Sequence, residues 1–372
     1  MTARRSLSDS ERRAWLRLAR TETIGPATFA ALIARFSDVH EALDAAPRLA
    51  HRGGAKDLRI PGEAEARAEI EALARIGGRF LASSEPDFPS GLSALDPPPP
   101  LIAVLGHTAL FKREMVAVVG ARNASALGIK FTSRLAADLG AAGLVVVSGL
   151  ARGVDQAAHK GSIDTGTIAV VAGGIDIVYP PEHQGLYDEL RARGAIVSEM
   201  PLGMAPLSRH FPRRNRLISG LARGVVVIEA AERSGSLITA NYALEQGREV
   251  FAVPGSPLDP RAKGANRLIR DGATLTESAN DVLNVLRPIL GQAFHEPPDH
   301  ELAPPPAGQP ADEREVDRVR SLVEEKLGPA PVEVDELIRQ CATPAAAVLT
   351  VLLELELAGR AQRHPGTRFA WR

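Results

Sequence analysis

The chain has 372 residues, of which 45% are hydrophobic and 24% charged, a composition that excludes a disordered or collagen-like protein. Single cores stop growing well below this length, so we expect several domains. The formal net charge of −1 means that any nucleic-acid binding must depend on a local basic patch. Aromatic residues are only 4%, so packing must depend on aliphatic side chains, which favours an α/β protein with buried parallel strands.

Cys341 is the only cysteine, which excludes internal disulfides, thiolate zinc sites and CxxC redox chemistry. The first fifteen residues are polar and charged, and no apolar run approaches the roughly 20 residues that span a bilayer. We therefore expect a cytoplasmic protein with no membrane segment and no metal site.

Residues 1–100 are predicted to form a small helical domain and a connector. Ser8 to Glu11 is a capping signal, and an apolar face begins at Trp15. The break at Ile24-Gly25-Pro26 is typical of the hairpin in a helix-hairpin-helix or sterile-alpha-motif-like unit. Such a hairpin can present backbone N–H groups to a phosphate, or it can serve only to pack helices. The proline run from Pro97 to Pro100 predicts the connector to the next domain.

Residues 101–290 alternate between short apolar runs and helical stretches. The predicted strands lie at 116–120, 144–149, 167–174, 195–200, 224–230 and 249–255, and the predicted helices include 126–142 and 237–246. This βαβ rhythm predicts a Rossmann-like, doubly wound parallel sheet over residues 105–286.

The end of the chain has the outline of a winged-helix domain. A proline-rich linker is predicted at 291–312, then helices at 313–327, 332–341 and 344–358 and a hairpin at 360–372. The third helix carries Glu354 and Glu356 and no basic residue, so it would repel a DNA major groove. We therefore expect this domain, 313–372, to contact mainly protein. The wing arginines are candidate phosphate contacts, and they are Arg360, Arg363 and Arg368.

Three predicted strands end in small residues followed by candidate anion-binding groups. The segments are Gly120-Ala121-Arg122, Ser148-Gly149 with Arg152, and Gly173. Glycine at the carboxyl edge of a parallel sheet lets an anion approach backbone N–H groups and a helix dipole. Each turn taken alone is also explained by tight turn geometry. None of them has the GxGxxG pattern of a dinucleotide site.

Asp155 and His159 lie one helical turn apart, a spacing that could serve acid–base catalysis. An aspartate at a helix start is more often a cap, so we predict no catalytic residue.

The segment from Pro206 to Arg216 is rich in arginine. No acidic residue lies between Glu199 and Glu229, whereas five arginines do: Arg209, Arg213, Arg214, Arg216 and Arg223. Phe211 among them is an aromatic on which an unpaired base can stack. The pattern predicts single-strand binding; the alternative is a core phenylalanine beside a solvated basic face.

Taken in order, seven segments over residues 105–275 resemble the DNA-processing protein A (DprA/Smf) family. They are GARNAS, SGLARGVDQAAH, AVVAGGIDIVYP, GAIVSEMPLG, FPRRNRLISGL, VVVIEAAERSGSLITANYALEQGREVFAVPG and KGANRLIRDGA. The helical front and the winged-helix tail also match architectures of this family.

The resemblance implies a homodimer that binds single-stranded DNA, protects incoming DNA in natural transformation and loads a RecA-type recombinase, without turnover and without a cofactor. It makes Arg122 the phosphate-binding arginine and Phe211 the stacking aromatic. The predicted DNA-binding residues are Gly120, Arg122, Ser148, Gly149, Arg152, Gly173, Phe211, Arg214, Asn215 and Arg216. The family's GSR appears here as Gly120-Ala121-Arg122, which keeps the arginine and removes a hydroxyl donor.

The main alternative is a lysine-decarboxylase-like phosphoribohydrolase, which binds nucleotides at the same strand ends. Its PGGxGT loop is replaced here by Ser234-Gly235-Ser236-Leu237-Ile238-Thr239, and no glutamate follows until Glu245. Hydrolysis is therefore not the expected activity.

Overall fold

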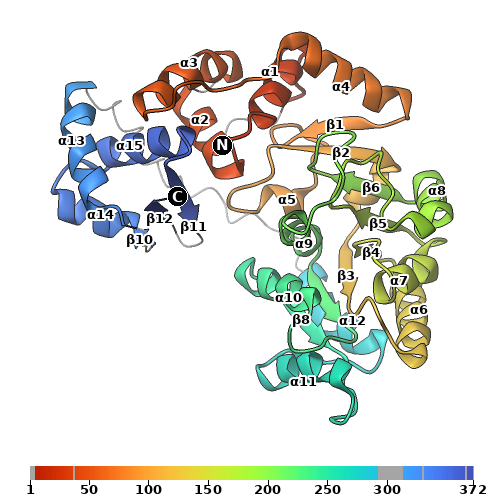
Figure 1. The fold of residues 1–372 in the computed structure, drawn as a ribbon. Coiled ribbons are helices and arrows are strands. Elements are labelled where there is room, and N and C mark those ends of the chain that lie inside the picture. Colours follow the sequence, from red (N-terminus) through yellow and green to blue (C-terminus); the bar gives the residue numbers. More distant parts are fainter. Residues whose placement is uncertain (1–4, 37, 292–312, 329–330, 365–366, 372) are drawn as a thin grey trace. The chain divides into compact units, whose positions relative to one another are not determined.

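The computed structural model describes residues 5–36, 38–291, 313–328, 331–364 and 367–371, and it divides into two compact units (Figure 1). One unit contains residues 1–7 and 67–293, and the other contains residues 8–66 and 294–372. The proline-rich linker predicted at 291–312 lies outside the described residues apart from Gly291.

The first unit is built on a nine-stranded sheet in the order β1-β2-β6-β5-β4-β3-β7-β8-β9. The strands are β1 (Arg79–Ala82), β2 (Leu101–Gly106), β3 (Met115–Val119), β4 (Val145–Ser148), β5 (Thr167–Val170), β6 (Ala195–Ser198), β7 (Gly224–Val227), β8 (Glu249–Ala252) and β9 (Thr274–Leu275). β3 to β9 run parallel, whereas β2 pairs antiparallel with both β1 and β6. The predicted α/β doubly wound sheet is confirmed, with two antiparallel strands added at one edge.

The added strands lie partly upstream of the boundary expected near residue 100. β1 precedes the proline run Pro97 to Pro100 and β2 follows it, so the prolines lie in a loop between two strands of one sheet. A proline run interrupts regular structure in either case, so the sequence pattern did not distinguish a loop within a domain from a connector between domains.

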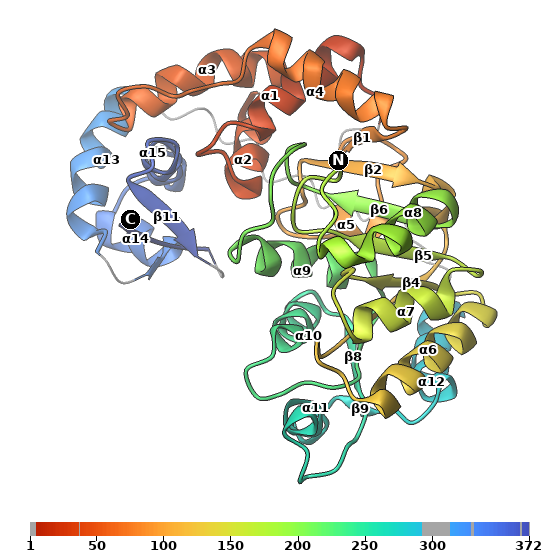
Figure 2. The same cartoon turned by 45° about the vertical axis from the view of Figure 1, so that its right-hand side comes forward.

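Helices cover both faces of the sheet, because alternate residues of each strand point to opposite sides. One face packs against α6 (Ala126–Ala141), α7 (Val154–Ser162) and α12 (Ala279–Gly291), and the other against α5 (Ser90–Ser93), α9 (His210–Leu221), α10 (Gly235–Glu245) and α11 (Lys263–Arg270) (Figure 2). α8 (Gln184–Arg193) packs on β2, β5 and β6. Three short 3₁₀ segments complete the unit: η1 (Thr108–Lys112), η2 (Pro181–His183) and η3 (Pro260–Ala262).

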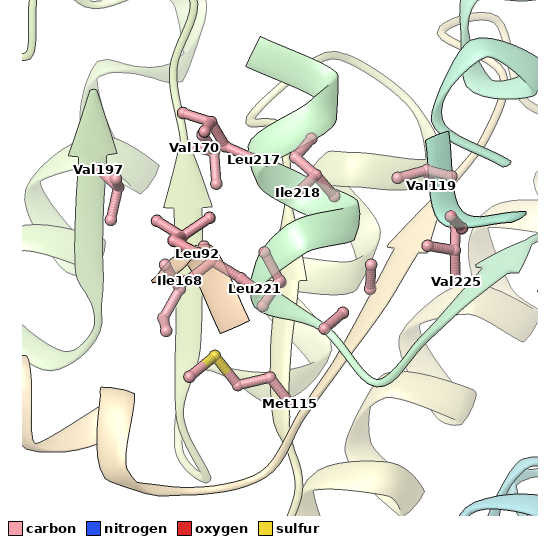
Figure 3. Close-up of a cluster of buried hydrophobic side chains, with 14 of the residues drawn as sticks. Leu92, Met115, Val119, Ile168, Val170, Val197, Leu217, Ile218, Leu221 and Val225 are labelled. Carbon is pink, nitrogen blue, oxygen red and sulfur yellow. The ribbon is translucent and has the colours of Figure 1, made fainter. Parts of the chain in front are cut away.

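α9 is held on the sheet by its apolar side chains. Leu217, Ile218 and Leu221 lie over Ile168 and Val170 and their neighbouring strand residues in one buried cluster (Figure 3). Because this packing fixes the second half of α9, its first turn is held at the carboxyl edge of the central strands.

The second unit combines helices from both ends of the chain. Its elements are α1 (Asp9–Ala19), α2 (Pro26–Phe36), α3 (Val39–Arg52), α13 (Glu313–Lys326), β10 (Val332–Glu333), α14 (Val334–Cys341), α15 (Ala345–Leu357), β11 (Ala361–His364) and β12 (Arg368–Trp371). α4 (Glu63–Arg75) bridges the sequence boundary between the units. Ser8 and Glu11 form the predicted capping box. The three C-terminal helices and the sheet β10-β12-β11 confirm the winged-helix outline.

In the described part of the chain, no helix is both long and apolar enough to cross a bilayer.

Candidate nucleic-acid interface

A pocket of about 290 Å³ lies at the carboxyl ends of β3, β4 and β5, where the sequence placed its glycine-bearing turns. We call it the Phe211 pocket. Its lining is Arg122, Asn123, Gly149, Ala151, Arg152, Val171, Ala172, Gly173, Ile177, Tyr179, Pro180, Pro206, Phe211 and Arg214. The loops after three separate strands and the start of α9 thus contribute to one site, as predicted from the strand ends.

Phe211 is the aromatic centre of this pocket, and it is only half-buried. The guanidinium of Arg122 lies 4.8 Å from the centre of its ring. Tyr179, which is 46% exposed, meets it edge to face with ring centroids 6.0 Å apart. Because part of the ring remains accessible, the alternative that Phe211 is an ordinary core residue is not supported.

The Arg122 side chain is exposed and forms no ion pair with any residue that the structure describes. Its turn follows β3 and precedes α6, whose N-cap Ser125 accepts from the backbone N–H of Gly128. The Ser125 hydroxyl and backbone N–H also donate to Glu229, at 2.5 Å and 2.9 Å. The turn is therefore anchored at Ser125, and the Arg122 guanidinium is available to a phosphate.

A larger groove of about 720 Å³ continues from the Phe211 pocket and shares Arg122, Phe211 and Arg214 with it. On its far side lie Ser234, Gly235 and Ser236 at the start of α10, with Arg233 and Arg261 beside them. The Ser234 side chain caps α10 by accepting from the backbone N–H of Ser236. A helix start flanked by arginines suits a second phosphate along a strand.

The predicted glycines leave room for neighbouring groups. A Cβ on Gly149 would lie 1.7 Å from Arg214 Nη1, and a Cβ on Gly173 would lie 2.8 Å from the carbonyl oxygen of Met204. A Cβ on Gly120 would lie 2.6 Å from a methyl of Val154. These three positions require glycine because the protein itself fills the space, and Gly149 and Gly173 also line the pocket.

Arg214 lies beneath the pocket and is 5% exposed. Its Nη1 donates to the carbonyl oxygen of Val170 at 2.8 Å, and burial lowers its pKa to about 10. Burial also raises the pKa of Asp155, an effect that the nearby Arg214 guanidinium opposes. Arg214 was predicted as a DNA contact, and the structure makes it first an internal cation that donates to a strand carbonyl near the buried Asp155 carboxylate.

Asp155 accepts from the backbone N–H of Ala151 at 3.3 Å, in the first turn of α7. The N-cap of α7 is Gly153 and no side chain caps this helix, so Asp155 is not the predicted cap and instead binds the backbone of the loop before the helix. His159 is fully buried, its Nδ1 lies 2.7 Å from the Thr167 hydroxyl, and burial, more than the nearby Arg214 and His183, lowers its pKa to about 3. Its imidazole is therefore neutral at pH 7.

The Arg-rich segment carries less free charge than its sequence indicates. Glu199, whose side chain is 3% exposed, pairs with Arg213 at 3.3 Å and with Arg216 at 2.5 Å. Arg223 pairs with Glu114 at 2.7 Å, before β7 begins. The expectation of an uncompensated basic surface is thus corrected, because two carboxylates reach the segment from other elements.

The remaining predicted residues divide between the site and the interior. Arg152 lines the pocket and pairs with Glu182. Asn215 lines the groove, and its side-chain amide donates to the Gly235 carbonyl oxygen at 3.2 Å. Ser148 is fully buried and donates to the Val118 carbonyl oxygen, so it supports β4 and does not face the pocket.

The lining residues that were absent from the predicted set include Asn123, Tyr179, Arg233 and Arg261. Asn123 and Tyr179 occur in the GARNAS and AVVAGGIDIVYP segments, so the motifs contained their signal. Arg261 lies 30 residues or more from the other groove residues of α9 and β3, and only the fold brings it near.

Comparison with known families covers all three parts of the chain. A model of DNA recombination-mediator protein A matches residues 79–287, a DprA-like N-terminal HHH domain matches 9–72, and a DprA winged helix domain matches 303–367.

Similar whole proteins give the same result. Protein Smf of Synechocystis is 31% identical over 98% of this chain and 99% of its own length. The putative DNA processing protein DprA of Mycobacterium tuberculosis is 34% identical over 96% of this chain and 94% of its own.

Two solved structures also match. DprA from Streptococcus pneumoniae superposes with a TM-score of 0.65 and 33% identity, over 73% of this chain and 97% of that one. DNA processing protein A from Helicobacter pylori, whose structure describes a single-stranded DNA binding mode, gives 0.53 and 27% over 58% of this chain and 98% of that one. Family models, relatives and structures agree, and the chain belongs to the DprA/Smf family of DNA processing proteins.

Proposed function

We propose that the chain binds single-stranded DNA at the Phe211 pocket, with one base stacked on Phe211 and a neighbouring phosphate held by Arg122. The observation that supports this most directly is a half-exposed aromatic ring beside an exposed arginine that no described carboxylate neutralises. Stacking on an aromatic contributes about 1–3 kcal/mol per base and requires an unpaired strand. The Helicobacter pylori relative, whose structure describes a single-strand binding mode, supports the same assignment.

Duplex DNA fits this site less well. Its bases are already stacked on one another, so a ring at the surface gains nothing without extruding a base, at a cost of a few kcal/mol. The arginine contact to phosphate is available to both forms. Preference for the single strand should therefore reside in Phe211.

We further infer a cytoplasmic homodimer that protects incoming DNA and loads a RecA-type recombinase onto it, without turnover. Asp155 is the one carboxylate among the described residues that line the groove. Its pKa is raised by burial, and its neighbour is the cation Arg214. We infer that this carboxyl group supports the loop before α7 and takes no part in turnover.

The test is fluorescence anisotropy of a labelled single strand and of its duplex, for the wild type, Phe211→Ala and Phe211→Tyr. We expect Phe211→Ala to weaken single-strand binding by about 1–3 kcal/mol and to leave weak duplex binding unchanged. Phe211→Tyr retains the ring and should bind as the wild type does. Equal binding of both DNA forms, unaffected by Phe211→Ala, would contradict the assignment.

The loading proposal has a separate measurement. A RecA-type recombinase is mixed with a single strand already covered by single-strand-binding protein, and its ATP hydrolysis is followed. The wild type should shorten the lag before ATP hydrolysis reaches its steady rate, and Phe211→Ala should not. If the wild type binds the strand but leaves the lag unchanged, DNA binding stands and loading fails.

A further inference from the structure

α15 of the winged-helix domain is buried on almost every side. Among its residues, Thr350, Val351, Leu352, Leu353, Glu354 and Leu355 are each at most 8% exposed. Helices of helix-turn-helix proteins that read DNA must present one face to the major groove. In α15 the exposed positions are confined to its first two turns, where Leu349 is 50% exposed.

Two helices from the other end of the chain cover α15. α2 and α3 both contact it within the second unit. From α2, the Arg35 guanidinium donates to the Thr350 hydroxyl at 3.0 Å, and the Thr28 hydroxyl lies near the Glu356 carboxylate, where it opposes the rise in pKa that burial causes. These contacts join residues more than 300 positions apart in the sequence.

A buried carboxylate lies at the centre of the contact. The Glu354 side chain is fully buried, and Arg52 at the end of α3 approaches it at 3.3 Å. Arg320 of α13 holds its second oxygen. Arg52 also bonds to Asp317 of α13, at 3.3 Å. An unpaired buried carboxylate is strongly unfavourable, so α15 with Glu354 requires cations from its neighbours.

The backbones of α3 and α15 also approach closely. A Cβ on Gly53, the residue after α3, would lie 1.9 Å from the carbonyl oxygen of Glu354. The Gly53 carbonyl oxygen accepts from Arg360 of the wing at 3.3 Å. Gly53 has a φ of −72°, a backbone conformation that any residue can adopt. Glycine is required there because the α15 backbone lies so close.

We propose that the winged-helix domain is the docking partner of the N-terminal helical domain, with α15 serving as the protein-binding surface and not as a reader of duplex DNA. The two domains thereby form a clasp between the chain ends, defined by Thr28, Arg35, Arg52 and Gly53 on one side and Thr350, Glu354 and Glu356 on the other. The acidic side chains of α15, which would repel phosphates, suit the arginines of α3 and α13.

The test uses the full chain with Thr350→Cys as a probe and measures maleimide labelling. Cys341, which is buried in the core of the winged-helix domain, reports on the integrity of that domain in the same sample. Gly53→Ala serves as a wedge, meaning a substitution that should separate α3 from α15, because the added methyl group has no room between them. Gly62→Ala is the matched control, because a Cβ there would have no heavy atom within 4 Å.

We expect the thiol introduced at position 350 to label slowly in Thr350→Cys alone and with Gly62→Ala. With Gly53→Ala it should label at least tenfold faster while Cys341 stays protected. Fast labelling at position 350 without the wedge would overturn the proposal, because α15 would then be uncovered. Labelling of both thiols with the wedge would also overturn it, because the contact would not be a separable docking surface. The proposal would also be overturned if adding duplex DNA slowed labelling at position 350 in the Gly53→Ala variant. In that case α15 would bind duplex DNA once the N-terminal helices no longer cover it.

Discussion

Two parts of the molecule place an arginine over an aromatic ring at the same spacing and use the pair differently. Arg122 lies 4.8 Å from the ring centre of Phe211, and Arg363 of the wing lies 4.8 Å from that of Phe369. Phe211 is half-exposed, whereas Phe369 is 2% exposed. Arg363 also pairs with Glu356 at 3.3 Å, but no described carboxylate pairs with Arg122. The same two residue types line an accessible pocket, our proposed DNA site, in one place and form a buried packing contact in the other.

From this comparison we propose that the role of an arginine here depends on whether a carboxylate already pairs with it. A guanidinium that is paired inside the protein must lose that pairing before it can bind a phosphate. Four arginines span the range from fully buried to free, and substituting each of them tests the rule.

The largest expected effect is on stability, at Arg214. Arg214→Met should lower the free energy of unfolding by about 3–5 kcal/mol, because it leaves the buried Asp155 without a cation. Urea denaturation measures it. Adding Asp155→Asn should restore part of the lost stability. The control is Arg213→Met: the Arg213 side chain is 45% exposed, so this change should alter stability by less than about 1 kcal/mol. Normal stability with lost strand binding would instead make Arg214 a direct DNA contact.

Next is Arg122, whose loss should affect binding and not folding. Arg122→Ala should weaken single-strand binding by about 1.5–3 kcal/mol and reduce the salt slope by about 1, with unchanged stability. Anisotropy across a salt series measures both. Arg122→Lys keeps the charge and should keep the slope while losing the planar contact to Phe211. An unchanged slope for Arg122→Ala would place the phosphate elsewhere.

The substitution of Arg216 should have a smaller effect, and in contrast to Arg122 it should lower stability more than DNA affinity. Arg216→Ala should cost about 1–2 kcal/mol of stability, because Glu199 is buried and loses a partner. Its single-strand affinity should fall less than about threefold, since the guanidinium is already paired. Thermal unfolding and anisotropy on the same preparation compare the two quantities, and a large affinity loss at full stability would break the rule.

The smallest effect is predicted for Arg363, and it should depend on pH. Arg363→Ala should cost about 0.2–1 kcal/mol at neutral pH and leave binding to both DNA forms unchanged. Burial raises the pKa of Glu356, and Arg363 opposes that rise. The pair is favourable only while Glu356 is ionised, so the cost should disappear as pH falls through the Glu356 pKa. A cost that persists in acid would assign it to lost packing.

The sequence predicted the parts of the site that depend on local pattern. Apolar runs and glycine-bearing turns located Gly149, Gly173 and Arg122 at one sheet edge, because parallel strands bring their carboxyl ends together. The order of the helices and the hairpin predicted the winged-helix domain.

Long-range pairing was beyond the sequence pattern. Glu199 lies just after β6, and nothing local indicates that it neutralises Arg213 and Arg216 on α9. In the same way, Arg52 and Glu354 are about 300 residues apart, and nothing local indicates that this arginine pairs with the acidic helix α15. Charge counted along a chain differs from charge at the surface wherever packing brings distant groups together.

The composition of the second unit from both chain ends has a consequence for biosynthesis. The helices α1, α2 and α3 leave the ribosome before α15, which packs on α2 and α3 and is translated roughly 290 residues after them. At about 5–20 residues per second, this interval is about 15–60 s. During that time the nascent helices α2 and α3 lack their partner, so the unit can complete folding only after α15 has been translated.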